Sequence, residues 1–240
     1  MDIMLSGVNK YTNKSLITCA ITLAIQTLGY RTCLYNPFND QSYIRKHRID
    51  DSDNIFYDRY KTNIEFANTY KLSSFYDNPI DNKKNKDEIN LSRIYFHYKE
   101  LLENYDAVVS EDTDTLMTPL TDKLLNYEIV KMLDIPIALI TSPCHDWFER
   151  SLYAINCIQN MGFTLRGIII NRFPHNPDKE AVNLRKHIEI YTNCPVLGVI
   201  KEFSNDSYPS TNELAYNILQ NIDMSKLLGR KIYYPSYLNF

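Results

Sequence analysis

Two adjacent residues, Lys14 and Ser15, stand where this chain could bind a phosphate group. Asp2 to Ser6 has the pattern of a short strand, residues 7–13 (GVNKYTN) that of a polar turn, and Lys14 opens an apolar helix that ends at Gly29. In such a unit, the N–H groups of the loop and of the helix N-terminus point at an anion. The lysine places its charge at the β- and γ-phosphates of a nucleotide, and the hydroxyl coordinates Mg²⁺. The layout predicts a P-loop, whose loop residues Gly7, Tyr11, Thr12 and Asn13 would surround the phosphates.

The predicted loop departs from the usual P-loop sequence at two positions. Asn13 stands directly before the lysine, where the pattern has glycine, and Gly7 lies one residue outside the usual spacing. Asparagine is the non-glycine residue that best adopts a left-handed backbone, so the loop can still close. The alternative is an ordinary turn in which the Lys14-Ser15 pair is incidental.

A carboxylate in a second segment completes the pattern of a nucleotide site. Glu111 follows the apolar run at residues 106–110 (DAVVS), and Asp112 and Asp114 come next. Mg²⁺ takes a few hard oxygen ligands from protein and fills its other positions with water and phosphate oxygens. Glu111 is therefore the first candidate ligand for Mg²⁺, and the alternative is that it only caps a loop.

Composition excludes several other classes of protein. The chain has 240 residues, is 44% hydrophobic and 23% charged, and carries a net charge of −3, which favours a folded domain and argues against nonspecific binding of nucleic acid. We expect no membrane helix, because no apolar run is long enough, and no signal peptide, because the first residues do not show its layout. The five cysteines are scattered, as in a cytoplasmic protein, and the five histidines lack the spacing of a zinc site.

The segments that must position these residues alternate between apolar strands and helices. Strands are predicted at residues 2–6, 31–36, 106–110, 135–141, 165–171 and 195–200. Helices are predicted at residues 14–29, 88–103, 122–133, 147–161, 177–191 and 210–224, with a shorter candidate at 52–60. We therefore predict an α/β fold in one domain, residues 1–240: a doubly wound, mainly parallel sheet of six strands with helices on both faces. Ligands of such sheets lie at the carboxyl ends of the strands.

Several motifs in this order resemble those of the dethiobiotin synthetases, which are P-loop enzymes. The family loop G-T-D-T-x-V-G-K-T corresponds to residues 7–15, and a segment that ends in Y-K-P corresponds to residues 29–37 (GYRTCLYNP). A family Ser-Asp pair falls on residues 52–53, and V-E-G-A-G-G-x-x-x-P-L falls on residues 110–122. G-L-x-x-x-G-x-x-x-N and P-x-L-G-x-I-P correspond to residues 162–171 and 195–201. The resemblance covers most of the chain.

The resemblance implies a ligase of biotin biosynthesis that uses ATP and Mg²⁺ to close a ureido ring on 7,8-diaminononanoate with CO₂. It also implies a homodimer in the cytoplasm that binds neither nucleic acid nor membrane. Lys14 would hold the phosphates, Ser15, Asp53 and Glu111 would hold Mg²⁺, and Asn171 would meet the adenine.

Other positions depart from the family pattern. The family lysine of Y-K-P, which serves the diamine end, is Asn36 here, and G-A-G-G is residues 112–115 (DTDT). Two aspartates thus add negative charge to a site that must receive anions, and Lys10 is a nearby cation that could offset it. We assign catalytic roles to Lys14, Asn36 and Lys10. The alternative is a divergent P-loop protein that binds nucleotide and has lost this reaction or acts on another substrate.

Overall fold

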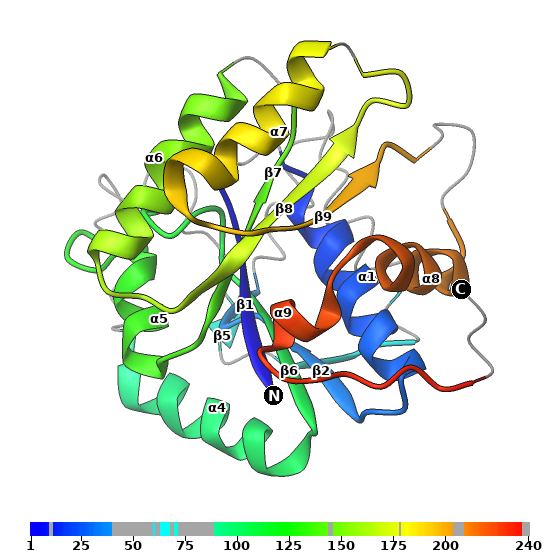
Figure 1. The fold of residues 1–240 in the computed structure, drawn as a ribbon. Helices are drawn as coiled ribbons and strands as arrows, with labels where there is room; N and C mark the ends of the chain where they lie inside the picture. Colours follow the sequence, from blue (N-terminus) through cyan, green and yellow to red (C-terminus); the bar gives the residue numbers. More distant parts are fainter. Residues whose placement is uncertain are drawn as a thin grey trace, which may run out of the picture.

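The strand β1 (Asp2–Gly7) lies at the centre of a parallel sheet in the computed structural model of the chain (Figure 1). The structure describes residues 1–9, 12–39, 60, 63–67, 70–71, 89–143, 146–177, 179–203 and 209–236. Within these residues the sheet has seven strands in the order β4-β2-β6-β1-β7-β8-β9, and each adjacent pair is parallel. The predicted doubly wound α/β fold is confirmed.

Six of the seven strands follow the predicted apolar segments. Besides β1 they are β2 (Thr32–Tyr35), β6 (Ala107–Glu111), β7 (Ile137–Thr141), β8 (Leu165–Phe173) and β9 (Val196–Lys201). The seventh, β4 (Glu65–Ala67), pairs with β2 at the edge and was not predicted, because three residues are too few to show a period of two. A separate parallel pair joins β3 (Phe38–Asn39) to β5 (Tyr70–Lys71).

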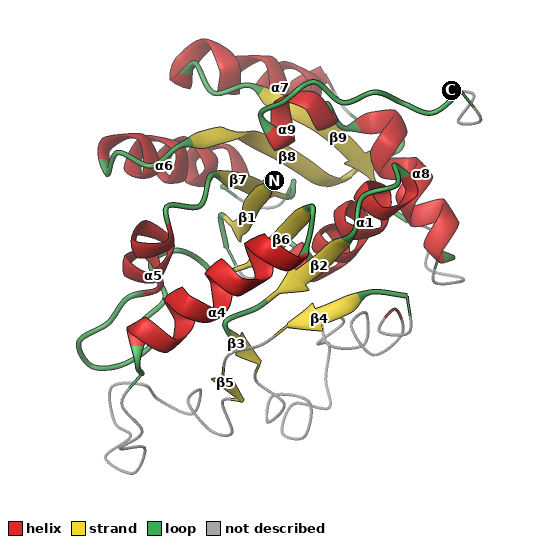
Figure 2. Cartoon of the chain, turned by 90° about the horizontal axis from the view of Figure 1, so that it is seen from below, coloured by secondary structure: helices red, strands yellow, loops and turns green. Residues whose placement is uncertain are grey.

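Apolar side chains cover both faces of the sheet, as expected for parallel strands. Along β1, Ile3 and Leu5 point to one face and Met4 to the other. The first face is covered by α1 (Lys14–Thr27), α8 (Thr211–Asn221) and α9 (Met224–Leu228). The second face is covered by α4 (Leu91–Asn104), α5 (Asn126–Leu133), α6 (Trp147–Asn160) and α7 (Lys179–Thr192) (Figure 2).

Two helices differ most from their predicted bounds. The helix predicted at 122–133 begins only at Asn126, and the helix predicted at 210–224 ends as α8 at Asn221, with the unpredicted helix α9 starting at Met224. The division between α8 and α9 occurs at Ile222, whose extended backbone forms an isolated bridge with Gly198 of β9. A Cβ on residue 198 would overlap the carbonyl of Asn221, so the absence of a side chain lets the chain pass there. The helix predicted at 52–60 lies outside the described residues except for Tyr60.

The strand register brings the predicted loops together at the carboxyl edge of the sheet. Leu5 of β1 lies opposite Glu111 of β6, and Gly7 lies opposite Ile140 of β7. The loop after β1 therefore starts between the ends of β6 and β7. In the described part of the chain, no helix has the length and apolar character needed to cross a membrane.

Candidate functional site

The loop between β1 and α1 is held by its backbone. Val8 N donates to Ile140 O at 2.9 Å, and Asn13 adopts the left-handed region (φ 53°, ψ 43°) directly before the helix. A Cβ on Gly7 would lie 2.7 Å from Asn9 O and 2.8 Å from Thr12 Oγ1, which is closer than real side chains approach. Glycine at the end of β1 and a left-handed asparagine before Lys14 are thus what lets the loop fold back on itself.

Lys14 is buried at the first position of α1 and points at the segment that follows β6. Its Nζ contacts Asp112 Oδ1, and it donates to Asp112 O at 2.6 Å and to Asp114 O at 3.1 Å. Glu111 Oε1 lies 4.0 Å from the same nitrogen. Burial alone would lower the pKa of Lys14, but the charges of Asp112, Glu111 and Asp114 and the hydrogen bond with Asp112 outweigh it, so the pKa is raised. Lys14 is therefore charged at neutral pH.

Ser15 and Glu111 bring two oxygen atoms to one point at the end of β6. Ser15 Oγ donates to Glu111 Oε1 at 2.6 Å, and the two residues are only 4% and 3% exposed. A hydroxyl and a carboxylate are ligands that suit Mg²⁺, with phosphate oxygens and waters as the remaining ligands. This donor set fits the predicted magnesium, although the described residues contain no group of three or more His, Cys, Asp or Glu able to hold a metal by themselves.

Asp112 is a buried acid that contacts Lys14 directly, and this contact was not predicted. One of its carboxylate oxygens contacts Lys14 Nζ, the other accepts from Ser6 Oγ, and the residue is 2% exposed. The sequence predicts Asp112 only as an extra charge near the phosphates and gives no prediction for Ser6. The signal available was an aspartate directly after a buried strand, opposite a Lys-Ser pair, in a position where the resembling family has glycine.

Asn171 lies near the end of β8 and contacts the same loop. Its Nδ2 donates to Thr12 O at 2.9 Å, and Ser142 Oγ donates to that oxygen at 3.2 Å. Thr12 and Asn171 are each 1% exposed. The structure thus joins Asn171 to the loop, as a residue of one site, through the backbone of Thr12.

Asn36 follows β2, one strand further from β1. The register pairs Tyr35 with Ser110, which puts Asn36 level with Glu111 at the same edge of the sheet. Its Oδ1 accepts from Phe38 N at 3.0 Å, and its N donates to Ala67 O at 3.1 Å. The other predicted site residues, Lys10, Tyr11 and Asp53, lie outside the described residues.

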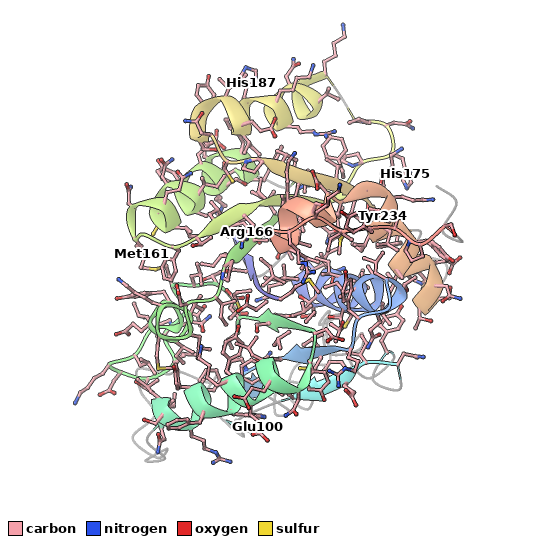
Figure 3. All side chains as sticks on the ribbon, turned by 60° about the horizontal axis from the view of Figure 1, so that its bottom comes forward. Glu100, Met161, Arg166, His175, His187 and Tyr234 are labelled. Atoms are coloured by element: carbon pink, nitrogen blue, oxygen red, sulfur yellow. The ribbon has the colours of Figure 1, made fainter. Side chains whose placement is uncertain are left out.

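Two of the described histidines, His175 and His187, lie away from this network. Figure 3 shows His175 and His187 at separate places on the periphery of the molecule. His187 stacks on Tyr191 of α7, with ring centroids 5.7 Å apart, and His175 hydrogen-bonds with Glu202 O at 3.0 Å. These contacts are those of surface side chains.

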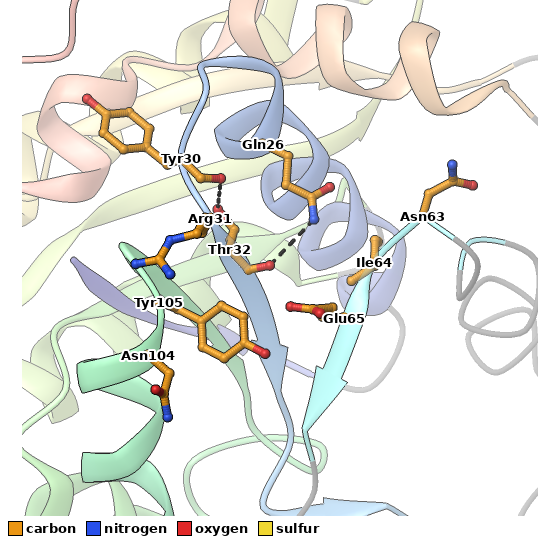
Figure 4. A pocket seen from close by; sticks show the side chains of 9 residues that line it. All are labelled: Gln26, Tyr30, Arg31, Thr32, Asn63, Ile64, Glu65, Asn104 and Tyr105. Atoms are coloured by element: carbon orange, nitrogen blue, oxygen red, sulfur yellow. Dashed lines mark hydrogen bonds between the residues drawn. The ribbon is translucent and has the colours of Figure 1, made fainter.

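A hollow of about 640 Å³ opens at the opposite, amino edge of the sheet. Its lining is mostly polar and includes Arg31, Glu65 and Tyr105 (Figure 4). Gln26 reaches from α1 to the carbonyl of Thr32 at the start of β2, at 3.4 Å. None of the predicted site residues lines this hollow, so it is separate from the network around Lys14.

Comparison with known proteins gives a consistent result. The model of a family described as an AAA domain matches residues 1–205. The ATP-dependent dethiobiotin synthetase BioD of Bacillus subtilis (strain 168) is 20% identical over 231 residues, 94% of this chain and 96% of that protein. The enzyme of the same name from Caldicellulosiruptor saccharolyticus is 24% identical over 217 residues, 85% of each chain. The predicted resemblance is confirmed.

Solved structures with the same fold support the assignment of the architecture. The MinC:MinD cell division protein complex of Aquifex aeolicus matches with a TM-score of 0.57 at 12% identity and covers 98% of both chains. A ParA family ATPase from Chlorobium tepidum TLS matches with a TM-score of 0.55 at 11% identity, over 94% of this chain and 93% of that one. At these identities the likeness concerns the fold alone, which is of the P-loop NTPase type.

Proposed function

The chain belongs to the AAA domain family, and we propose that it is an ATP- and Mg²⁺-dependent carboligase of the dethiobiotin synthetase type. The reaction would close a ureido ring on 7,8-diaminononanoate with CO₂. Similarity to two synthetases over 85% or more of the chain supports this proposal. We further propose a single domain that acts as a homodimer in the cytoplasm.

One observation carries the proposal: Lys14, Ser15 and Glu111 meet at the end of β1 and β6. They come from segments about a hundred residues apart, yet Ser15 and Glu111 are hydrogen-bonded at 2.6 Å and the lysine lies 4.0 Å from the same carboxylate oxygen. An ammonium and a hydroxyl at the start of a helix, with a carboxylate from the neighbouring strand end, are the groups that a magnesium–triphosphate complex requires. An incidental Lys-Ser pair in an ordinary turn would not bring a buried glutamate to it.

Each of these residues would have a distinct role. Lys14 would bind the β- and γ-phosphates through charge and N–H donation. Ser15 and Glu111, with Asp53, would hold Mg²⁺, which when bound neutralises charge on the phosphates. Loop N–H groups from Gly7 onwards, including Tyr11, Thr12 and Asn13, would surround the phosphates.

The residues outside the phosphate loop would act on the rest of the substrates. Asn171 would meet the adenine while its Nδ2 fixes Thr12. Asn36 would lie at the diamine end, where it offers a hydrogen bond without a charge, and Lys10 would supply positive charge for the carbamate and the transferring phosphoryl group.

A second candidate function is nucleotide binding without this reaction. In that case the chain keeps the fold but has lost the ligase reaction or acts on another substrate. Two observations favour it: the neutral Asn36 replaces a lysine, and Asp112 contacts Lys14. The loss of a charged group that acts on charge in the transition state typically lowers the rate by orders of magnitude.

Purified protein would be tested for ADP release with ATP, the diamine and bicarbonate. We expect slow turnover by the wild type, no ATP binding by Lys14→Ala, and faster turnover by Asn36→Lys, because its ammonium would stabilise negative charge on the carbamate. If wild type turns over at a rate that Asn36→Lys leaves unchanged, another group provides that charge. If no variant turns over while ATP still binds, the second candidate function replaces the first.

A further inference from the structure

We infer that Asp112 is an internal competitor of the nucleotide: its carboxylate occupies Lys14, and phosphate binds only when the aspartate leaves. This inference rests on the proposed nucleotide function and adds a regulatory contact to the same site. It concerns the binding step alone and is independent of which acceptor substrate the protein uses.

The first argument is the number of donors on Lys14. An ammonium group has three N–H donors, and Lys14 Nζ has three protein acceptors: Asp112 Oδ1, Asp112 O and Asp114 O. A phosphate that binds Lys14 must therefore displace at least one of these contacts. The carboxylate is the one that resembles phosphate, since it is an anion held by a charge-assisted hydrogen bond.

The second argument is burial. Lys14 and Asp112 are 6% and 2% exposed, so their attraction is only weakly screened by water and salt. Ser6 Oγ donates to the second carboxylate oxygen, so both oxygens of Asp112 have a partner while the aspartate contacts Lys14. Displacement of the aspartate requires that these contacts be broken together.

The third argument is where the chain can move. From Thr115 onwards the segment is fixed by hydrogen bonds: Thr115 O accepts from Asn126 Nδ2 at 3.2 Å, and Leu116 O accepts from Tyr127 N at 2.8 Å. Asp112 itself has the backbone bond Asp112 N to Leu5 O at 3.3 Å. Between these points, the buried hydroxyl of Thr113 has no hydrogen-bond partner among the described residues. Lys14 thus donates three hydrogen bonds to residues 112 and 114, and a shift of the Asp112 side chain is the smallest movement that releases the lysine.

The consequence for affinity follows from mass action. If only a fraction of molecules has Lys14 released from Asp112, the apparent dissociation constant is the intrinsic constant divided by that fraction. An aspartate that holds the lysine in nine molecules of ten, for example, weakens binding about tenfold.

The test is the affinity of wild type and Asp112→Asn for ATP and for inorganic tripolyphosphate, both in EDTA, by calorimetry. Asparagine keeps the size of the side chain and removes its charge, so we expect at least about tenfold tighter binding of both ligands. The matched control is Asp134→Asn, the same change at an exposed left-handed position after α5, which should bind as the wild type does. Tripolyphosphate lacks the base, so an equal gain for it places the effect at the phosphates.

Ser6→Ala provides an independent variant in case Asp112→Asn does not fold. It removes the hydroxyl that steadies Asp112 and keeps every charge, so we expect a smaller gain in affinity. The inference is overturned if Asp112→Asn binds both ligands no tighter than the wild type while Lys14→Ala abolishes binding. Where only Ser6→Ala folds, the same result for that variant overturns it. In either case the proposed nucleotide function still stands. If neither wild type nor either variant binds ATP or tripolyphosphate, both the inference and the proposed function are wrong.

Discussion

The two edges of the sheet treat charge in opposite ways. At the carboxyl edge, Lys14, Glu111 and Asp112 are at most 6% exposed and satisfy one another. At the amino edge, Arg31 and Asp106 form an exposed ion pair with 3.4 Å between Nε and Oδ2, and side-chain exposures of 71% and 43%. The hollow lies at the amino edge, whereas the residues proposed to bind phosphate lie at the carboxyl edge.

The proposed function rests on the buried cluster of charges and not on the open hollow, because the two features constrain the sequence to different degrees. Water satisfies polar groups around a hollow, so many sequences can line one. Buried charges are costly unless each has a partner in the right place, so the positions of Lys14, Glu111 and Asp112 must be specified together.

The largest expected effect is on stability. Lys14→Met would leave two buried carboxylates without their cation and destabilise the fold by about 3–5 kcal/mol. Arg31→Met, the same type of change at the amino edge, should give no measurable shift in the urea denaturation midpoint, because the ion pair there is exposed. Equal effects of the two substitutions would contradict the comparison.

A double variant tests the cause of that loss. Lys14→Met combined with Asp112→Asn removes one charge of each sign, so it should recover a large part of the stability that Lys14→Met loses. The measurement is the same urea titration, and additive losses in the double variant would show that the two side chains do not interact.

The second effect separates backbone strain from ligand binding. Asn13 and Asn193 both have left-handed backbones, with φ of 53° and 54°, but Asn13 lies at the carboxyl edge and Asn193 precedes β9 at the amino edge. Alanine at either position should destabilise the fold by roughly 1–2 kcal/mol, and glycine should not. Only Asn13→Ala should also weaken ATP binding in a calorimetric titration; an equal loss in Asn193→Ala would show that the weakening reflects stability alone.

The smallest effect concerns the hollow. The hydrogen bond of Tyr105 with Glu65, together with partial burial, raises the pKa of the tyrosine hydroxyl. Glu65→Gln removes the carboxylate charge and should therefore lower the pKa of Tyr105. The pKa is measured by ultraviolet titration of the wild type and of Glu65→Gln. The titration of the matching Tyr105→Phe variant is subtracted from each, so that only Tyr105 contributes to the signal. ATP affinity should not change in Glu65→Gln, and a loss of affinity would connect the hollow to the nucleotide site.

Much of the fold could be predicted, because continuous apolar segments leave few alternatives to a parallel sheet. The six long strands carry this signal, whereas β4 has three residues and too little pattern to identify. The division between α8 and α9 could not be predicted from local sequence, because it depends on Gly198 in a different strand.

The candidate site was predictable in its members rather than in its contacts. Lys14, Ser15 and Glu111 follow from motif and strand position, and the structure brings them together. The pairing of Lys14 with Asp112 depends on side-chain directions across two loops, which no local pattern encodes. Ser6 was missed because a serine inside an apolar strand has no signal of its own.

The packing of α1 on α8 has a consequence for the synthesis of the chain. The helix that begins with Lys14 is made early, but part of its surface packs against α8, about two hundred residues later (Figure 1). The family match ends at residue 205, before this cover begins. A nascent chain of that length lacks α8, so the part of α1 that packs on α8 stays uncovered until nearly the whole chain has been made. During translation this helix is a surface that chaperones can bind.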